Sequence, residues 1–374
     1  MIAIEFEILS KRRPDPVGLV NINDFELREH GQIDVGEILT NDRISLYAFD
    51  FEGGRVVFVD GASSDELSQA PFYYQAQYES AVRVITLPIE IMIGLAQSVT
   101  LDDRKLIFIQ SMGRCGSTLA SKLLAQLPGV INMSEPDTLT QLIIARFTQP
   151  DKQVEMKMLL DATVRLLCKA PVQTAWVIKG RSWVIELGDW LHELYPRAKT
   201  IYLYREAESW INSNLSAFID VAGKTPEEFR QMEIESRGWM KFFVPSIARY
   251  DPDQHLTATG LTTLMWLDNV ERYMDWHKAG IEMLAIPYAN WKLDARQTAV
   301  SMLEYCGHRP DDLSAIEDTL SKDSQAGSVV AQDTVQKNKS NISSILDRAE
   351  MNRFLQNHPY IHSPNFEVAN SLKL

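Results

Sequence analysis

Five short apolar runs, separated by stretches of helical length, are the feature that most restricts how this chain of 374 residues can fold. The runs follow Lys105 and read LIFIQ, GVINM, AWVIK, TIYLYR and EMLAIPY. Such alternation is typical of a parallel sheet, because each parallel connection needs a crossover that can hold a helix. The sequence therefore predicts an α/β fold with a parallel sheet flanked by helices.

The first hundred residues follow a different pattern, which indicates a small α+β module. The runs ISLYAFDF and RVVFVDG flank residues 52–54 and predict a β-hairpin, and FYYQAQYESAVRVI predicts a helix that leads into a strand or a second helix. We place a boundary near Asp102. The expected domains are an N-terminal accessory module at 1–101 and a P-loop-type α/β domain at 102–374.

Two further features of the chain lie beyond residue 224. The segments EEFRQMEIESRGWMKFFVPSIARY and LTATGLTTLMWLDNVERYMDWHKAG predict two long helices, the second closed by Gly280, and both are expected to cover the sheet. Residues 321–344 are rich in Ser, Gln, Asn and Lys and predict a surface loop.

Charge and cysteine usage exclude several classes of protein. The 37 basic and 50 acidic side chains leave a net charge of −13, which opposes non-specific binding to nucleic acid or to an anionic membrane. The three cysteines, Cys115, Cys168 and Cys306, form no CxxC pair, and the seven histidines form no HExxH motif. We therefore expect no disulfide framework, no metal and no nucleic-acid partner.

The hydropathy pattern of the chain indicates neither export nor a membrane anchor. The opening MIAIEFEILSKRRPD places acids among its apolar residues and its basic cluster after them, the reverse of a signal peptide. The stretch from Val84 to Val99 falls short of the roughly 20 residues that a membrane-spanning helix needs. We expect a cytoplasmic protein without a membrane partner, and we leave a homodimer open.

A strand, a glycine-containing turn and a helix follow one another around residues 111–118, SMGRCGST. Two glycines allow the backbone N–H groups to point inward, two hydroxyls add donors, and the helix start adds a positive end, all of which suit an anion. A tight strand-to-helix connection explains the pattern equally well when it is taken alone. The candidate anion-binding residues are Gly113, Arg114, Cys115, Gly116, Ser117 and Thr118.

This turn differs from the loop of Walker-type ATPases, which requires GxxxxGK[ST]. Gly116 stands directly before the Ser117-Thr118 pair, where that motif has a lysine. The sequence therefore disfavours ATP hydrolysis of this type and leaves Arg114 as the cation of the loop.

Charged residues follow the next three predicted strands in the same way. Glu135 follows GVINM, Lys179 ends AWVIK and Arg205 ends TIYLYR. Each has an ordinary explanation as a helix-start carboxylate, a solvated lysine or half of a surface ion pair. Because ligands of open parallel sheets bind at the carboxyl ends of the strands, all of these residues together with the loop favour one anion site.

The helix predicted after Arg205 adds hydroxyl groups to this edge. Ser209 and Ser213 lie one turn apart in EAESWINS and therefore share a face. A guanidinium and a hydroxyl on adjoining elements suit a second phosphate group.

These motifs together resemble the sulfotransferase superfamily, whose donor is 3′-phosphoadenosine 5′-phosphosulfate (PAPS). The similarity is greatest to the branch that contains tyrosylprotein sulfotransferases and related bacterial enzymes. In that branch the phosphosulfate loop carries arginine rather than lysine, as at Arg114, and a glutamate after the second strand is the proposed base, as at Glu135. The resemblance runs from about Lys105 to about Lys339. Cys115 departs from the pattern, because serine is commoner there and its hydroxyl donor is lost.

The resemblance implies a reaction and a role for each residue. A sulfuryl group moves from PAPS to a hydroxyl of a small molecule, peptide or sugar, and 3′-phosphoadenosine 5′-phosphate (PAP) is released, the reaction type of EC 2.8.2. The implied roles are a general base at Glu135 with Asp137 in reserve, stabilisation of the transferring group by Arg114, Lys179 and Ser324, and binding of the 3′-phosphate by Arg205 and Ser213 with Lys337 or Lys339 closing over it.

Several alternatives stay open at this point. The shared loop and sheet keep a small-molecule P-loop kinase in view, and a nucleotide-binding regulator without turnover would show the same motifs. His255 is a less favoured base because it matches no motif. The side chains Trp239, Met240 and Trp266 belong either to the core or to an acceptor pocket. The net charge of −13 disfavours a long sulfated glycan as acceptor.

Overall fold

The computed structural model describes residues 2–15, 18–171, 174–218, 231, 237–238, 240–249, 256–309, 314–322 and 346–374. The chain divides into two compact units. The first comprises Met1–Phe108, Ser121–Val184 and Trp190–Lys199, and the second comprises Ile109–Ala120, Ile185–Asp189 and Thr200–Leu374. The domain boundary expected near Asp102 stays a prediction.

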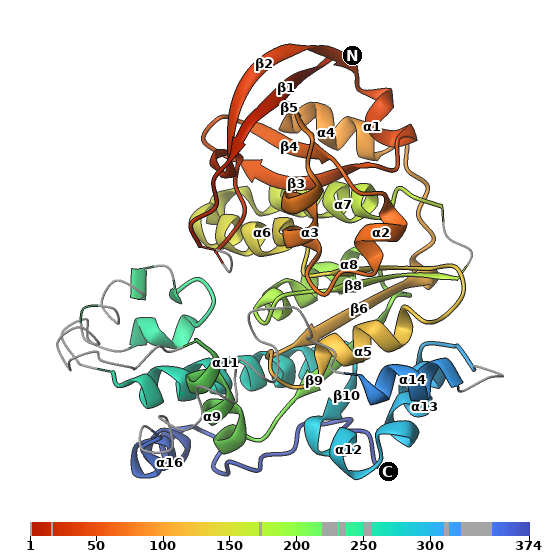
Figure 1. The fold of residues 1–374 in the computed structure, drawn as a ribbon. Helices are drawn as coiled ribbons and strands as arrows, with labels where there is room; N and C mark the ends of the chain where they lie inside the picture. The colour runs from red at the N-terminus through yellow and green to blue at the C-terminus, as the bar shows by residue number, and fades with distance from the viewer. Residues whose placement is uncertain are drawn as a thin grey trace. The chain divides into compact units, whose positions relative to one another are not determined.

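The N-terminal part of the first unit contains an antiparallel sheet of five strands in the order β2-β1-β5-β4-β3. The predicted hairpin is confirmed as β3 and β4, and the predicted helix followed by a strand is confirmed as α3 and β5 (Figure 1). The strands are β1 (Ile2–Lys11), β2 (Phe25–Asp34), β3 (Ile44–Asp50), β4 (Arg55–Asp60) and β5 (Arg83–Pro88). The helical segments are η1 (Ile22–Asp24), α1 (Gly36–Thr40), α2 (Ser64–Ser68), α3 (Tyr73–Ser80), α4 (Ile89–Ala96) and η2 (Asp103–Lys105).

One face of this antiparallel sheet carries an apolar core that also holds a buried hydrogen bond. Phe25, Tyr47, Val57 and Tyr74 are among the buried side chains of this core. The Tyr47 hydroxyl donates to the Asp24 carboxylate over 2.6 Å. Burial raises the pKa of Asp24, and the hydrogen bond from Tyr47 opposes that effect. The short η1 turn is thereby fixed to the sheet.

The five apolar runs form the second sheet, which is parallel and has the order β10-β9-β6-β8-β7. The predicted fold class is confirmed. Every residue of β6 and β8 is buried, which explains why both read as continuous apolar runs rather than alternating ones. The strands are β6 (Leu106–Ser111), β7 (Val130–Ser134), β8 (Ala175–Lys179), β9 (Lys199–Tyr204) and β10 (Leu284–Pro287).

Helices account for most of the remaining described chain. The bounds are α5 (Ser117–Leu124), α6 (Asp137–Thr148), η3 (Pro150–Lys152), α7 (Gln153–Leu167), η4 (Val184–Leu187), α8 (Gly188–Leu194), α9 (Ala207–Phe218), η5 (Pro245–Arg249), α11 (Ala258–Lys278), α12 (Tyr288–Leu293), α13 (Ala295–Tyr305), α14 (Ser314–Ser321) and α16 (Arg348–Asn357). Within the described ranges, no helix combines the length and apolarity needed to span a membrane.

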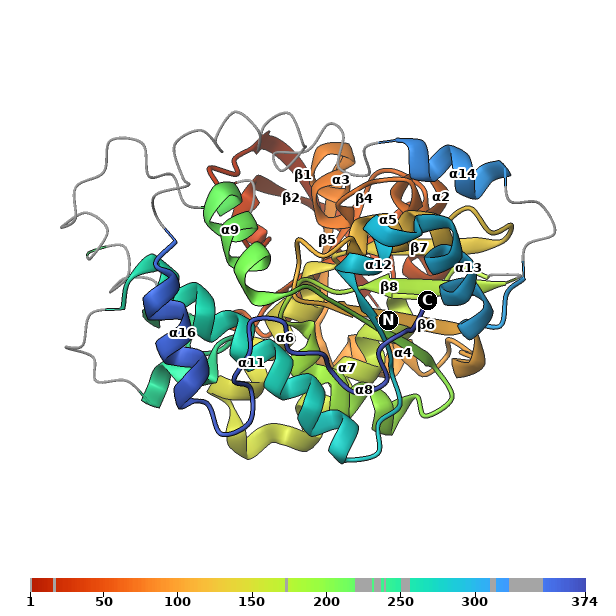
Figure 2. The same cartoon turned by 90° about the horizontal axis from the view of Figure 1, so that it is seen from below.

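The second predicted long helix is confirmed as α11, which packs against both α9 and α16 (Figure 2). Thr257 caps its start, and Gly280 follows its end with a φ of 84° that favours glycine. The ring of Tyr273 stacks on Tyr202 of β9 at 4.4 Å, so α11 packs against the sheet as expected. The first predicted long helix, at 227–250, is described at 231, 237–238 and 240–249; there, residues 241–243 form a turn and Pro245–Arg249 form the 3-10 helix η5, so a continuous helix to the predicted end is wrong. Almost all of the predicted loop at 321–344 lies outside the described residues.

A cluster of buried polar groups in the first unit fixes β7, the strand that leads to Glu135. The Asn132 backbone N–H donates to Ser68 Oγ over 2.8 Å, and the Asn132 side chain donates to the Ser68 carbonyl over 3.3 Å. Ser121 Oγ donates to Asn132 Oδ1 over 2.5 Å. Because all three residues are buried, each of these groups needs its protein partner.

Replacing the central residue of this cluster, Asn132→Ala, should lower the free energy of unfolding by about 1–3 kcal/mol, because it strands the Ser121 hydroxyl and the Ser68 carbonyl. Urea unfolding followed by circular dichroism measures the change. The matched control Asn352→Ala, at an exposed position of α16, should stay within about 0.5 kcal/mol of the parent chain. Equal losses in the two variants would contradict the interpretation.

Candidate functional site

The predicted anion-binding loop lies in the second unit, between β6 and the start of α5, and its backbone is bent throughout. Gly113, Arg114 and Gly116 have φ values of 72°, 51° and 87°. Left-handed residues in close succession turn backbone N–H groups toward one side, which is the geometry of an anion-binding concavity. Arg114 is the informative one, because a side chain makes this conformation costly and such strain gathers at functional sites.

Several contacts within the second unit hold this loop in place. The Trp210 indole N–H donates to the carbonyl of Gly113 over 2.9 Å, and the Met112 N–H donates to the carbonyl of Leu203 in β9 over 3.3 Å. Cys115 is buried, and its thiol donates to the same Leu203 carbonyl over 3.2 Å. The Cys115 side chain therefore contacts the strand, and only its backbone N–H can serve the loop.

Gly116 sits against an aromatic wall made by α12. A Cβ at this position would lie 3.2 Å from two ring atoms of Trp291, which is tighter than an ordinary contact. Trp291 is buried, and among the described residues its indole N–H has no hydrogen-bond partner. A glycine is required here by both the φ value and the space, and the wall adds a donor group beside the loop.

The cations and hydroxyls predicted for a second phosphate also meet in the second unit. Arg114 Nε donates to Ser213 Oγ over 3.2 Å, and Arg205 donates to the carbonyl of Arg114 over 3.2 Å. Arg205 Nε donates to Ser209 Oγ over 2.6 Å. The two serines share one face of α9 as predicted, although Ser213 bonds to Arg114 and Ser209 to Arg205. We call Arg114, Arg205, Ser209, Ser213 and the loop at 113–118 the loop cluster.

Aromatic side chains that the sequence analysis did not assign to the site hold Arg205 in position. The Arg205 guanidinium lies 4.5 Å from the ring centre of Tyr288, a cation–π distance. The Trp266 indole N–H donates to the Arg205 carbonyl over 2.8 Å. Trp266 and Met240 are buried, so both belong to the core. No sequence motif marks the two aromatic contacts, because they depend on how α11 and α12 pack.

Glu135 and Lys179 meet in the first unit, where they form an ion pair between Lys179 Nζ and Glu135 Oε1. The Lys179 side chain is only 2% exposed, whereas that of Glu135 is 18% exposed. The Glu135 N–H also donates to the Lys179 carbonyl over 2.7 Å. A buried ammonium needs a counter-charge, and Glu135 supplies it while keeping an accessible edge.

The backbone of Glu135 is as unusual as that of Arg114. Its φ is 65°, although the following residue is Pro136, which normally favours an extended backbone in the residue before it. The strand β7 ends one residue earlier, at Ser134. A carboxylate held in the left-handed region by its surroundings is a further sign of a functional position.

Asp137, the reserve base, has a structural role in the first unit. It forms an ion pair with Arg181, with Arg181 Nε 2.6 Å from Asp137 Oδ1, and it accepts the Val20 N–H over 3.0 Å. Burial raises the pKa of Asp137 to about 6, and the guanidinium of Arg181 opposes that effect. Its side chain is fully buried, which disfavours contact with an acceptor. The Arg181 guanidinium also lies 4.3 Å from the ring centre of Tyr74.

The predicted site residues thus fall into two groups, the loop cluster of the second unit and the Glu135–Lys179 pair of the first. Their assembly into a single site stays a prediction. Five residues named in the sequence analysis lie outside the described residues: Trp239, His255, Ser324, Lys337 and Lys339. Across the described ranges, no three His, Cys, Asp or Glu side chains gather as a metal site.

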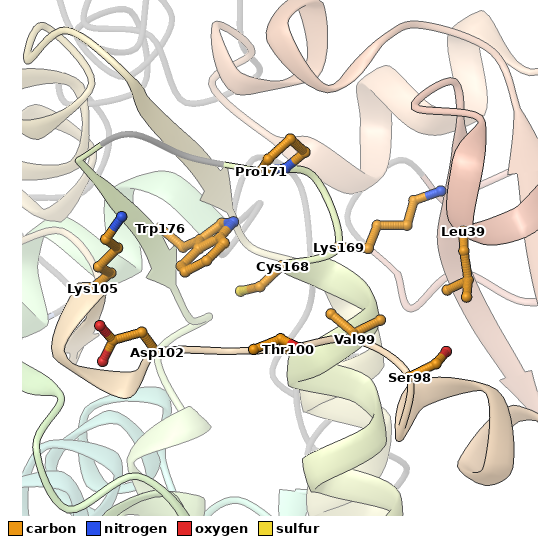
Figure 3. A pocket seen from close by; sticks show the side chains of 10 residues that line it. All are labelled: Leu39, Ser98, Val99, Thr100, Asp102, Lys105, Cys168, Lys169, Pro171 and Trp176. Carbon is orange, nitrogen blue, oxygen red and sulfur yellow. The ribbon is translucent and has the colours of Figure 1, made fainter.

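A cavity of about 450 Å³ lies elsewhere in the first unit, between η2 and the end of α7 (Figure 3). Its lining includes Lys105, Cys168 and Trp176 and contains none of the predicted site residues. Lys169, which also lines the cavity, donates to the carbonyls of Ile38 and Asn41, so the Lys169 ammonium caps the C-terminal end of α1. Burial lowers the pKa of Lys169 to about 8.

No protein-family model matches the chain, and no curated protein matches it. Solved structures similar to it include three sulfotransferases. They are a sulfotransferase from Alicyclobacillus acidocaldarius (17% identity, 55% of this chain and 82% of that chain, TM-score 0.36), sulfotransferase STF9 from Mycobacterium avium (13%, 62% and 71%, 0.40) and sulfotransferase STF1 from Mycobacterium tuberculosis H37Rv (12%, 83% and 98%, 0.37). At these low scores, the function proposed below rests on the residues of this chain.

Gly116→Ala tests the geometry of the loop. The new methyl group meets Trp291 in a backbone conformation that favours glycine, so the free energy of unfolding should fall by about 1–3 kcal/mol. Urea unfolding followed by tryptophan fluorescence measures the change. The control Gly94→Ala lies at an exposed position of α4 with open space around it, and it should stabilise the chain by up to about 1 kcal/mol. A gain in stability for Gly116→Ala would refute the loop geometry.

Proposed function

We propose that the chain is a sulfotransferase that moves the sulfuryl group of PAPS to a hydroxyl group of an acceptor. The bond between sulfur and the bridging phosphate oxygen breaks, a bond between sulfur and the acceptor oxygen forms, and the acceptor proton passes to a base. The products are the sulfated acceptor and PAP. A small molecule, a peptide and a sugar remain the acceptor classes, and the cytoplasm remains the expected compartment.

One observation carries this proposal: charged residues lie at or just after the ends of four neighbouring strands of one parallel sheet, and they contact each other in two chemically distinct groups. The loop cluster is cationic and rich in hydroxyls, as a doubly anionic nucleotide requires. The Glu135–Lys179 pair combines an accessible carboxylate with a buried cation, as a proton transfer beside developing negative charge requires. Ligands of open parallel sheets bind at the carboxyl ends of the strands, and on this general rule we propose that both groups serve one site.

The residues of the loop cluster suit the two anionic groups of the donor. The backbone N–H groups of residues 113–118 and the start of α5 would hold the 5′-phosphosulfate, with Arg114 as the nearby cation. Arg205 and the serines of α9 would hold the 3′-phosphate through charge-assisted hydrogen bonds. The side chain of Arg205 is already oriented by Ser209 and Tyr288, so little of its conformational freedom remains to be lost on binding.

The Glu135–Lys179 pair suits the proton transfer. Glu135 is the base that takes the acceptor proton, and its accessible edge leaves room for that hydroxyl. Once Glu135 is protonated, the Lys179 ammonium loses its counter-charge. Lys179 then stabilises the negative charge that develops on the transferring group and the leaving phosphate. The bond between the backbones of the two residues keeps their side chains together through this change.

A small-molecule kinase is the alternative that the loop leaves open. Gly116 stands where ATP-binding loops of the Walker type place a lysine, which favours the sulfotransferase. A regulator without turnover would bind the nucleotide and transfer nothing. Parallel titrations with PAP and with ATP distinguish a sulfotransferase from a kinase, because a kinase should bind ATP more tightly. An assay of sulfuryl transfer distinguishes a sulfotransferase from a regulator, because a regulator transfers nothing.

Arg205→Ala should remove the recognition of the 3′-phosphate. We expect the dissociation constant for PAP to rise by about 10- to 100-fold, because charge-assisted hydrogen bonds are worth about 1.5–3 kcal/mol. The constant for 5′-AMP, which lacks that phosphate, should change little. Isothermal titration calorimetry measures both. The control Arg309→Ala, whose side chain is 81% exposed, should bind PAP like the parent chain. An equal loss for the two nucleotides would refute the assigned role.

Glu135→Gln should reduce kcat for sulfuryl transfer by about 10²- to 10⁴-fold, the usual contribution of a general base. PAP binding should remain, which shows that the variant is folded and that the loss lies in the chemical step. The control Glu90→Gln changes an exposed carboxylate of α4 and should leave kcat unchanged. Full activity of Glu135→Gln would exclude Glu135 as the base.

A further inference from the structure

Residues 364–372 run across the second unit after α16 and end beside α12 (Figure 2). They bond to elements that carry the loop cluster. The backbone of this segment forms two hydrogen bonds with Ala285 of β10. The Ala285 N–H donates to the carbonyl of Asn370 over 3.3 Å, and the Leu372 N–H donates to the carbonyl of Ala285 over 2.7 Å. The segment therefore pairs with β10, which is an edge strand of the parallel sheet.

The same segment contacts the residues on both sides of Arg205. Ser371 Oγ lies 2.7 Å from the hydroxyl of Tyr204, the last residue of β9. The carbonyl of Pro364 accepts the N–H of Ala207, the first residue of α9, over 2.8 Å. An N–H group at the start of a helix has no partner inside that helix, so Pro364 acts as an external cap. Arg205 is thus held between two points of attachment.

A third attachment reaches the aromatic wall of the loop. Asn290 Nδ2 donates to the carbonyl of Leu372 over 3.0 Å, and Asn290 is buried in α12. Tyr288, which contacts the Arg205 guanidinium, and Trp291, which packs on Gly116, lie on either side of it. A fourth bond runs from the Tyr273 hydroxyl in α11 to the carbonyl of Ala369 over 2.7 Å.

We infer that residues 364–372 form a strap that positions the loop cluster for the nucleotide without contacting the nucleotide. The strap fixes the end of β9, the start of α9 and the α12 helix, and these carry Arg205, Ser209, Tyr288 and Trp291. This inference rests on the proposed function, because the cluster that it positions is the proposed PAP site. The strap residues are positioning residues and have no part in the chemical step.

Ser371→Ala tests the strap at its contact with Tyr204. The dissociation constant for PAP should rise about threefold to tenfold, the factor that one hydrogen bond supports. Hydrogen exchange should become faster at the Ala207 amide and at the amides of residues 112–116. The control Lys373→Ala, one residue beyond the strap, removes an exposed ion pair with Glu367 and should change neither quantity.

A second variant separates positioning from stability. Ser371→Ala removes the hydroxyl that both Tyr204 and the Val368 carbonyl contact, whereas Tyr204→Phe together with Ser371→Ala also removes the buried Tyr204 hydroxyl and should restore part of the lost midpoint of urea unfolding. The dissociation constant for PAP should stay raised in the double variant, because the strap is still detached from β9. Recovery of PAP affinity together with stability, or unchanged affinity in Ser371→Ala, would overturn the inference.

The inference about the strap and the proposed function would be contradicted by different results. If the parent chain does not bind PAP, the proposed function is wrong, and the exchange of Ala207 and of residues 112–116 without nucleotide decides on the strap. Faster exchange in Ser371→Ala supports the strap, and unchanged exchange overturns it. If the parent chain binds PAP, the proposed nucleotide site stands whatever the strap variants show.

Discussion

A buried ammonium beside a carboxylate, the Lys179–Glu135 ion pair, is the interaction on which the interpretation of this protein depends. A lysine side chain that is 2% exposed would be strongly disfavoured without a counter-charge, so the pair must form when the first unit folds. The need for this counter-charge fixes the path of the chain after β7, and it outweighs the cost of the φ of 65° at Glu135. The same requirement leaves one edge of the carboxylate accessible. Folding thus places a base next to a cation that can stabilise developing negative charge.

The loop cluster obeys a comparable constraint, although its interactions are mostly with backbone atoms. Strained backbone at Arg114 and the lack of a side chain at Gly116 allow the loop to curl, and contacts from Trp210 and Trp291 hold that shape. Arg205 bonds to the Arg114 carbonyl and so links the loop to α9. The residues are oriented before any ligand arrives, which lowers the entropic cost of binding an anion.

The sequence predicted the elements that depend on local pattern. All five apolar runs became strands, the hairpin of β3 and β4 formed, Glu135 and Arg205 directly follow β7 and β9, and Lys179 is the last residue of β8. At residues 2–11, by contrast, the sequence analysis predicts no strand, although these residues form β1. The pairing of Arg205 with Ser209 and of Arg114 with Ser213 could not be predicted, because spacing shows a shared helix face but not which hydroxyl each guanidinium reaches. The roles of Trp210, Trp291 and residues 364–372 depend on packing between distant segments, which a single sequence does not reveal.

The central claim is that the loop cluster and the Glu135–Lys179 pair act on one donor molecule. A crystal structure of the protein with PAP tests it most directly. The claim predicts the 5′-phosphate on the backbone N–H groups of residues 113–118, the 3′-phosphate on Arg205, and Lys179 Nζ within hydrogen-bond reach of the 5′-phosphate. A nucleotide bound to the loop with Glu135 and Lys179 on a different face of the molecule would contradict it.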